Sequence, residues 1–271
     1  MSSKRILLYI SKIYRTYFSP YNYVAKNYEI PFLNRKREKS PFHQTANKVI
    51  YCFWTGNNPM SENRTHGIEC IKNNSDIPVI LITPNNLHKY VLEEYPLHHA
   101  YEYLSNVHKS DYLRCYFMHH FGGGYSDVKP HYKSWSSSFD NLNKDSTKFC
   151  IGYPEKRPED IGYIANFFSS KEVDKINKDM RNYYFTLIGN GSYIFKPNTD
   201  FTKLWITELH RRLDLVYEDL KQNPGNIMGD NEGYPLKWTS ILGEIFHPLC
   251  LIFKDEILLD PSLRPYLKNY R

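Results

Sequence analysis

Four residues near the middle of the chain combine types and spacing that could bind a charged ligand: Asp111, Arg114, Asp127 and Lys129. Asp111 and Arg114 are three positions apart in a stretch of helical composition, so they should share one helix face, either as a plain ion pair or as part of a site. Asp127 follows three glycines in the stretch FGGGYSDVKP, and glycine leaves space for the close approach of another group. A carboxylate beside glycines suits a metal-bound diphosphate or a sugar hydroxyl, because hard cations prefer carboxylate oxygen.

These residues must be held by a helix, a turn and a strand. The stretch SDYLRCYFMHHF predicts a helix with Ser110 as its N-cap, ending at the glycines Gly122-Gly123-Gly124. Residues 125–128 leave room for a very short strand, since Pro130 cannot continue a central strand. The turn would bring the helix back beside Asp127.

The preceding segment predicts the sheet. Residues 48–54, KVIYCFW, form a β-branched and aromatic run, residues 60–73 have helical composition, and residues 77–83, IPVILIT, are almost continuously apolar. Such a continuous run predicts a strand buried on both faces, as in a parallel sheet covered by helices. Strand, helix and strand at this spacing predict a βαβ unit, and ligands of open α/β sheets bind at the carboxyl ends of the strands. We therefore expect a single α/β domain with a mostly parallel central sheet flanked by helices.

The loop after the first strand is a second candidate for ligand contact. Trp54, Thr55 and Gly56 lie where that strand ends. Trp54 could belong to the core, or it could provide a flat aromatic platform beside a nucleotide base.

Two residues of the second half are further candidates. Asn190 lies in YFTLIGNGSYIF, where Gly189-Asn190-Gly191 predicts either a tight turn between two apolar pieces or a loop whose asparagine bonds a ligand. His247 precedes a proline; neutral imidazole can ligate Mn²⁺, and imidazolium can bind phosphate. Residues 201–221 predict one long amphipathic helix, which we assign to the scaffold. The paired histidines elsewhere lack a zinc-binding framework.

The stretch SDYLRCYFMHHFGGGYSDVK resembles the signature of the GT-A glycosyltransferases that carry the DxD sugar-binding motif, among them glycosyltransferase family 32 and the bacterial capsular polysaccharide synthesis proteins. KVIYCFWTGNNPM and YPLKWTSILGEIFHP are similar too, so the likeness covers about residues 47–250. It implies a GT-A-like, Rossmann-related domain that transfers a hexose or an N-acetylhexosamine from a nucleotide-diphosphate sugar, expected to be a UDP-sugar. The implied acceptor is a carbohydrate, such as a lipid-linked bacterial surface glycan, and the implied outcome is retention of anomeric configuration.

The resemblance also assigns roles to residues. Asp111 and Arg114 would hold the ribose and the transferred sugar, Trp54 would lie against the base, and Asp127 is the first aspartate of the motif. Mn²⁺ or Mg²⁺ is the implied cofactor, with Asp127 and His247 as its ligands. The glycine-rich and acidic loop at residues 229–233 would border the acceptor. The other residues expected at the donor site are Thr55, Gly56, Gly124, Tyr125 and Asn190.

Lys129 departs from this pattern, because it stands where the second aspartate of the motif is expected. An ammonium there would repel a nearby cation and could itself neutralise phosphate. Three alternatives follow: a metal bound by Asp127 with a later ligand, a metal-independent site in which Lys129 replaces part of the cation's charge, or an inactive relative that only binds nucleotide sugars or glycans.

Composition limits the remaining possibilities. The chain has 271 residues, 41% of them apolar and 24% charged, which indicates a globular protein rather than a disordered one. The net charge of +6 is spread along the chain, which suits a phosphorylated ligand or an anionic membrane better than nucleic acid. The five cysteines are scattered and odd in number, so we expect a reducing compartment, the cytoplasm.

The first residues predict an amphipathic helix that ends at Pro20. Its apolar side carries Ile10 and Tyr17 and its basic side carries Lys12 and Arg15. This helix could pack on the domain, or it could lie in an anionic bilayer interface on the inner face of a bacterial plasma membrane. We expect residues 1–46 to form this helix and an irregular lead-in, and residues 47–271 to form the catalytic domain.

Overall fold

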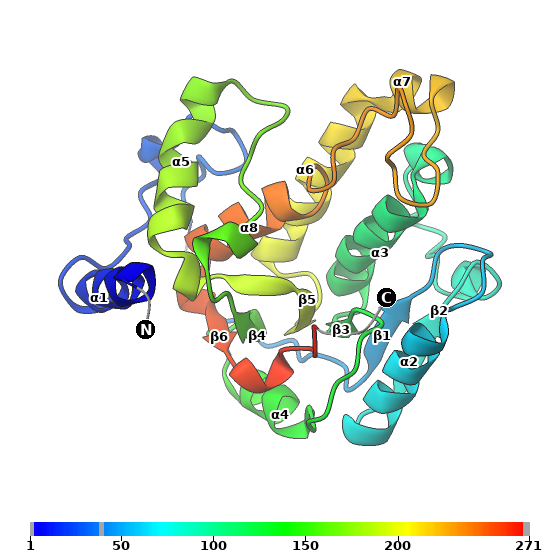
Figure 1. The fold of residues 1–271 in the computed structure, drawn as a ribbon, viewed down its shortest axis with the longest axis horizontal. Helices are drawn as coiled ribbons and strands as arrows, with labels where there is room; N and C mark the ends of the chain where they lie inside the picture. Colours follow the sequence, from blue (N-terminus) through cyan, green and yellow to red (C-terminus); the bar gives the residue numbers. More distant parts are fainter. Residues whose placement is uncertain (1–2, 38–40, 268–271) are drawn as a thin grey trace.

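The centre of the molecule is a six-stranded sheet, with its strands in the order β2-β1-β3-β5-β4-β6 among the residues that the computed structural model describes, 3–37 and 41–267 (Figure 1). The pairs β1–β2, β1–β3 and β4–β6 are parallel, whereas β5 is antiparallel to both β3 and β4. All described strands except β5 therefore point the same way, and the predicted mostly parallel sheet is confirmed. The strands are β1 (Ile50–Phe53), β2 (Val79–Ile82), β3 (Gly123–Ser126), β4 (Cys150–Pro154), β5 (Ile188–Phe195) and β6 (Ile257–Leu259).

Helices cover both faces of this sheet, so the fold is α/β with three layers. In Figure 1, α3, α5, α6 and α8 lie above the sheet and α2 and α4 lie below it. The helices are α1 (Ser3–Tyr17), α2 (Glu62–Asn74), α3 (Asn106–His120), α4 (Ser136–Lys144), α5 (Ser170–Asn182), α6 (Asp200–Leu215), α7 (Tyr217–Gln222) and α8 (Gly243–Ile252).

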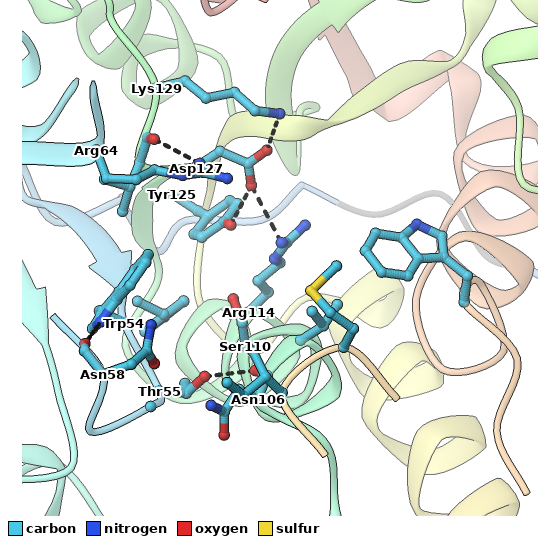
Figure 2. A pocket seen from close by; sticks show the side chains of 17 residues that line it. Trp54, Thr55, Asn58, Arg64, Asn106, Ser110, Arg114, Tyr125, Asp127 and Lys129 are labelled. Carbon is cyan, nitrogen blue, oxygen red and sulfur yellow. Dashed lines mark hydrogen bonds and ion pairs between the residues drawn. The ribbon is translucent and has the colours of Figure 1, made fainter. Parts of the chain in front are cut away.

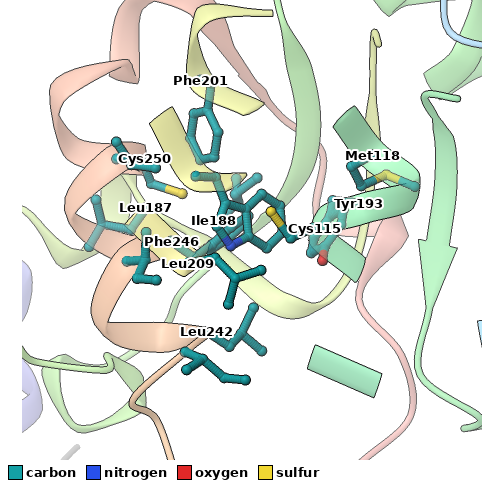
Figure 3. Packing of buried hydrophobic residues seen from close by; sticks show 14 of the residues in the cluster. Cys115, Met118, Leu187, Ile188, Tyr193, Phe201, Leu209, Leu242, Phe246 and Cys250 are labelled. Carbon is teal, nitrogen blue, oxygen red and sulfur yellow. The ribbon is translucent and has the colours of Figure 1, made fainter. Parts of the chain in front are cut away.

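Alternation along the strands divides the core into two clusters. Tyr51 and Phe53 of β1 join the larger cluster with the upper helices, whereas Ile50 and Cys52 join the smaller one with α2 and α4. This follows from the pleat of a strand, which turns successive side chains to opposite faces. Figure 3 shows the larger cluster, in which Tyr193 of β5 packs near Phe246 of α8, with their ring centroids 5.2 Å apart.

Several local predictions are wrong. The helix of the central motif begins at Asn106 with Ser105 as its N-cap, so Ser110 lies inside it. Asn190 and its flanking glycines form no turn but lie within the continuous strand β5, where Gly189 allows the Tyr153 ring of the neighbouring strand to approach. β2 is an edge strand and is only partly buried, because no described strand pairs with its outer side.

The predicted long helix of residues 201–221 is divided into α6 and α7 at Val216, whose backbone leaves the helical conformation. The lead-in after α1 buries Tyr28, Ile30 and Leu33 in the larger cluster, so it is part of the packed fold. All five cysteines are buried as free thiols.

α1 lies at the side of the molecule (Figure 1). Most of its apolar side chains are exposed. Its contacts with the domain are made by Leu8 and by two cations: Lys12 lies over the Phe185 ring, and Arg15 donates to Asn182 Oδ1 at 2.8 Å. None of the described helices is long and apolar enough to span a bilayer.

Candidate nucleotide-sugar site

A hollow of about 280 Å³ opens at the carboxyl ends of β1 and β3 (Figure 2). Its walls come from the loop after β1, the start of α2, the first half of α3, the segment after β3 and the loop before α8. This is the sheet edge at which the sequence predicted a ligand. The described side chains at its polar wall are those of Arg64, Asn106, Ser110, Arg114, Asp127 and Lys129.

Asp127 is the centre of this polar wall. Its Oδ2 accepts from Lys129 Nζ at 2.6 Å, and its Oδ1 accepts from the Tyr125 hydroxyl at 2.5 Å and lies 3.2 Å from Arg114 Nη2. Burial opposes ionisation of this carboxyl, yet Lys129 and Arg114 together hold its pKa at about 2. Asp127 is therefore an anion at neutral pH.

Arg114 is fixed from four directions. Its guanidinium lies 3.4 Å from Asp111 Oδ1, stacks over the Tyr125 ring at 4.6 Å and donates to the backbone oxygen of Asn190 at 3.2 Å, in addition to its contact with Asp127. Arg114 lines the hollow, whereas Asp111 is only 3% exposed and lies behind it. Burial raises the pKa of Asp111 to about 6, an effect that Arg114 only partly offsets. Asp111 is thus placed to orient the guanidinium.

The charge of the hollow is positive. Its described lining contains the cations of Arg64, Arg114 and Lys129 and the single carboxylate of Asp127. Arg64 is held at the start of α2 by a hydrogen bond from its Nη1 to the backbone oxygen of Val128, 2.8 Å away. Such a group of cations at strand ends suits a ligand with more than one negative charge, such as a diphosphate.

The loop after β1 forms the opposite, partly apolar wall. Trp54 is half-buried and lines the hollow, with its Nε1 donating to the backbone oxygen of Asn58 at 2.8 Å. Thr55 Oγ1 donates to the backbone oxygen of Asn106 at 2.5 Å, which ties this loop to α3. A Cβ at Gly56 would lie 2.2 Å from Asn58 Oδ1 and 2.4 Å from Asn106 Nδ2, so a larger residue there would make these two side chains move. The indole is therefore held at the edge of the cavity.

The model of the capsular polysaccharide synthesis protein family matches residues 10–196. The chain belongs to this family. The match includes β1, α3, β3 and β5, and it excludes the loop before α8. Among solved structures, the chain is distantly similar to the PaToxG glycosyltransferase, with 14% identity, a TM-score of 0.38 and coverage of 82% of this chain and 73% of that one. Comparison with curated proteins finds no match.

Four residues that the sequence predicted at a donor site do not line the hollow: Asp111, Gly124, Asn190 and His247. Gly124 lies within the sheet, and a Cβ there would meet the Trp135 ring at 3.0 Å. Asn190 contributes its backbone oxygen to Arg114, while its side-chain Oδ1 is buried without a described hydrogen-bond partner.

His247 is buried inside α8, where the structure does not bring it to Asp127. Its Nδ1 accepts from the backbone N–H of Gly162 at 2.9 Å, and its Nε2 lies 3.9 Å from Glu155 Oε1. Burial lowers the pKa of this imidazole to about 4, so it is neutral at physiological pH. Its contacts are those of a packing residue.

The contacts of Asp127 do not fit a divalent cation. Both of its oxygens are engaged by hydrogen-bond donors, two of them cationic, and no second carboxylate belongs to the described lining. An ion at Asp127 would have to displace Lys129 and would still lie beside Arg114.

A second possible metal cluster, at His98, His99 and Asp214, is also unsuited. His98 Nδ1 accepts from the backbone N–H of Ala100, so in the neutral ring the hydrogen is on Nε2, which donates to Asp214 Oδ1 at 3.0 Å. The atom that faces Asp214 therefore has no lone pair for a metal.

Sequence reasoning missed Arg64, Met228 and Trp238, which also line the hollow. Arg64 could have been found, because it is a cation three residues after the N-cap Ser61 of the helix that follows the first strand. The resemblance includes the segment that contains Trp238 and places residues 229–233 of the same loop beside the acceptor, but it gives Trp238 itself no role.

Proposed function

We propose that this member of the capsular polysaccharide synthesis family is a glycosyltransferase that moves a sugar from a nucleotide-diphosphate sugar, a UDP-sugar by the sequence resemblance, to a carbohydrate acceptor. The observation that carries the proposal is the grouping of Arg64, Arg114, Lys129 and Asp127 in one hollow at the strand ends. Its volume of about 280 Å³ is just below the roughly 300–1,000 Å³ range of ligand pockets, and the hollow is open to solvent.

The side chains on each wall of the hollow can bind a different part of the nucleotide-sugar donor. The face of Trp54 suits a base, the cations Arg64 and Lys129 suit the diphosphate, and Arg114 and Asp127 suit the hydroxyls of ribose and sugar. Asp111 would act through Arg114, since it does not reach the hollow itself.

We further propose that the diphosphate is neutralised by protein cations in place of Mn²⁺ or Mg²⁺. Support comes from the contact of Lys129 with Asp127, which uses the carboxylate that a metal would need. When a donor binds, the Lys129 ammonium can move from Asp127 to a phosphate oxygen, since a lysine is a flexible point charge.

A front-face displacement fits the charges of the hollow. The acceptor hydroxyl oxygen forms a bond to the anomeric carbon, and the bond from that carbon to the phosphate oxygen breaks with its electron pair leaving on the nucleoside diphosphate. The hydroxyl proton passes to the departing phosphate. Asp127, with a pKa of about 2 and cationic neighbours, is a weak base and a weak nucleophile, so positioning and electrostatic stabilisation of the leaving group would supply most of the acceleration.

Nucleotide binding tests the assignment of the hollow. Titration of the protein with UDP and with UDP-sugars in EDTA should show binding, and Arg64→Gln should weaken it by tenfold or more. Lys203→Gln, which removes an exposed cation of α6 and touches no part of the hollow, is the matched control. Equal affinities of the two variants would overturn the assignment.

We also propose that α1 lies on an anionic lipid surface. Ile6, Leu7, Tyr9, Ile10, Tyr14, Tyr17 and Phe18 are each at least 45% exposed, an apolar and aromatic surface that a monomer in water rarely leaves uncovered. Residues 3–28 contain no acidic side chain, so pairing of two copies through α1 would bring like charges together, whereas an anionic membrane would attract them.

A further inference from the structure

The loop between α7 and α8, residues 223–242, is long but firmly anchored beside the N-terminal end of α3 (Figure 1). The Tyr234 hydroxyl accepts from the backbone N–H of Ser105 at 3.1 Å and bonds His108 Nδ1 at 2.8 Å. His108 Nε2 lies 3.2 Å from the backbone oxygen of Lys237. Loops longer than about 12–15 residues without regular structure are uncommon in compact domains and are usually either functional or disordered linkers.

This anchored loop presents apolar side chains to solvent. Ile227 is 54% exposed, Met228 43% and Trp238 57%, and all three line the hollow that contains Asp127. The anchoring residue Tyr234, by contrast, is 7% exposed. The loop is therefore built with one buried side that fixes it to α3 and one uncovered apolar side.

A second hollow, of about 410 Å³, adjoins the first. Met228 and Trp238 line both, and Asp230, Asn231 and Lys237 add polar groups to the second. The two hollows therefore share a wall, and the first contains Asp127 and Arg114.

We propose that Trp238 and the second hollow form the acceptor-sugar site. A pyranose ring has faces of C–H groups and an edge of hydroxyls, so it matches an aromatic platform with polar groups at the rim. Because the two hollows share a wall, an acceptor in the second hollow would lie next to the sugar in the first. A displacement requires this proximity of the acceptor hydroxyl and the anomeric carbon. This inference rests on the proposed glycosyltransferase function, and it adds the residue that recognises the acceptor.

The rim favours a sugar over a protein partner or a lipid chain. The exposed apolar residues of the loop are few and lie between two hollows rather than on a flat face, and charged groups of both signs, Asp230 and Lys237, border the second hollow. Those groups would be costly to bury against an acyl chain, but they can bond hydroxyls.

A glycan array printed with bacterial capsular and lipopolysaccharide oligosaccharides tests the proposal with the full chain. Trp238→Ala should lower the affinity for the glycan that wild type binds by tenfold or more, and Trp238→Phe should retain it within about threefold. The matched control is Tyr95→Ala, which removes an aromatic side chain of similar exposure, 54%, that lines neither hollow. Circular dichroism establishes that each variant is folded.

The outcomes separate this inference from the proposed function. Equal glycan binding by Trp238→Ala and Tyr95→Ala overturns the acceptor site, as does the absence of any glycan bound by wild type. Trp238-dependent glycan binding without affinity for any nucleotide sugar would keep the acceptor site and contradict the transferase. Nucleotide-sugar turnover with glycan binding independent of Trp238 would contradict only the acceptor site.

Discussion

At the scale of single residues, Lys129 is paired with Asp127, the carboxylate that a metal would need, and it is one of three cations that line the hollow. Substituting Lys129→Asp would place a second carboxylate two residues after Asp127, and two carboxylates can hold a divalent cation. We predict that donor binding by this variant requires Mn²⁺ and is lost with EDTA, whereas binding by the wild type is unchanged by EDTA. Calorimetric titration of UDP with and without chelator is the measurement. Wild-type binding that disappears with EDTA would contradict the role given to Lys129.

Asp127 should also contribute to stability in a pH-dependent way. Its folded pKa of about 2 is below the value of 3.8 for an unperturbed aspartate, so its stabilising contribution is complete above pH 4 and is lost as the pH falls towards 2. The shift corresponds to about 2 kcal/mol. The loss of unfolding free energy in Asp127→Asn should therefore be about 1 kcal/mol smaller at pH 3 than at pH 7 in urea titrations. A loss independent of pH would show that the carboxylate is not held by its cationic neighbours.

Part of the site could be predicted from residue types alone. The spacing of Asp111 and Arg114 and the glycines before Asp127 were sufficient to place these groups together, because both relations are local in the chain. Asn190 and His247 do not line the hollow. Their surroundings depend on contacts with β4 and with Gly162, which no local pattern shows.

At the scale of elements, the buried histidine of α8 should make the fold sensitive to acid. Burial lowers the pKa of His247 to about 4, below the ordinary 6.5, so the unfolded chain takes up this proton first. Its stabilising contribution is complete above pH 6.5 and is lost as the pH falls towards 4. His247→Asn keeps an acceptor for the Gly162 N–H and removes the titration, so its unfolding free energy should fall by about 2 kcal/mol less than that of the wild type between pH 7.5 and pH 5. Equal decreases would contradict this account.

The surface of α1 gives a second prediction at this scale. The double variant Ile10→Ser/Tyr17→Ser should bind vesicles that contain phosphatidylglycerol at least tenfold more weakly than the wild type, because each exposed side chain would otherwise bury apolar area in the interface. Leu215→Ser/Leu259→Ser, which removes two exposed residues outside α1, is the matched control in flotation assays. Comparable binding by both double variants would exclude α1 as the lipid contact.

Element types were easier to predict than element boundaries. The apolar runs of β1 and β2 specified strands, but the position of β2 at the sheet edge depends on which strands pair, and it leaves β2 half-buried. Both Ser105 and Ser110 precede plausible helix starts, and Ser105 is the one that caps α3. The backbone N–H groups of residues 105–107 are bonded by the anchored loop of residues 223–242, and such long-range contacts cannot be predicted from the local sequence.

At the scale of the whole molecule, strand direction explains why the candidate site is where it is. β1 and β3 are parallel neighbours, so the segments that follow them, with Trp54 and Asp127, open at the same edge. The alternation of strands and helices was sufficient to predict this edge. The loop of residues 223–242 also lines this hollow, although it is far in sequence from β1 and β3. The family match does not extend to this loop.

Product release by the purified full chain tests the central claim most directly. The protein would be incubated in EDTA with a panel of nucleotide-diphosphate sugars and a mixture of bacterial surface oligosaccharides, and free nucleoside diphosphate would be measured by chromatography. We predict release from at least one donor, lowered a hundredfold or more by Asp127→Ala and by Arg114→Ala but unchanged by Lys203→Ala. Absence of release from every donor, or release that Asp127→Ala and Arg114→Ala leave unchanged, would contradict the account.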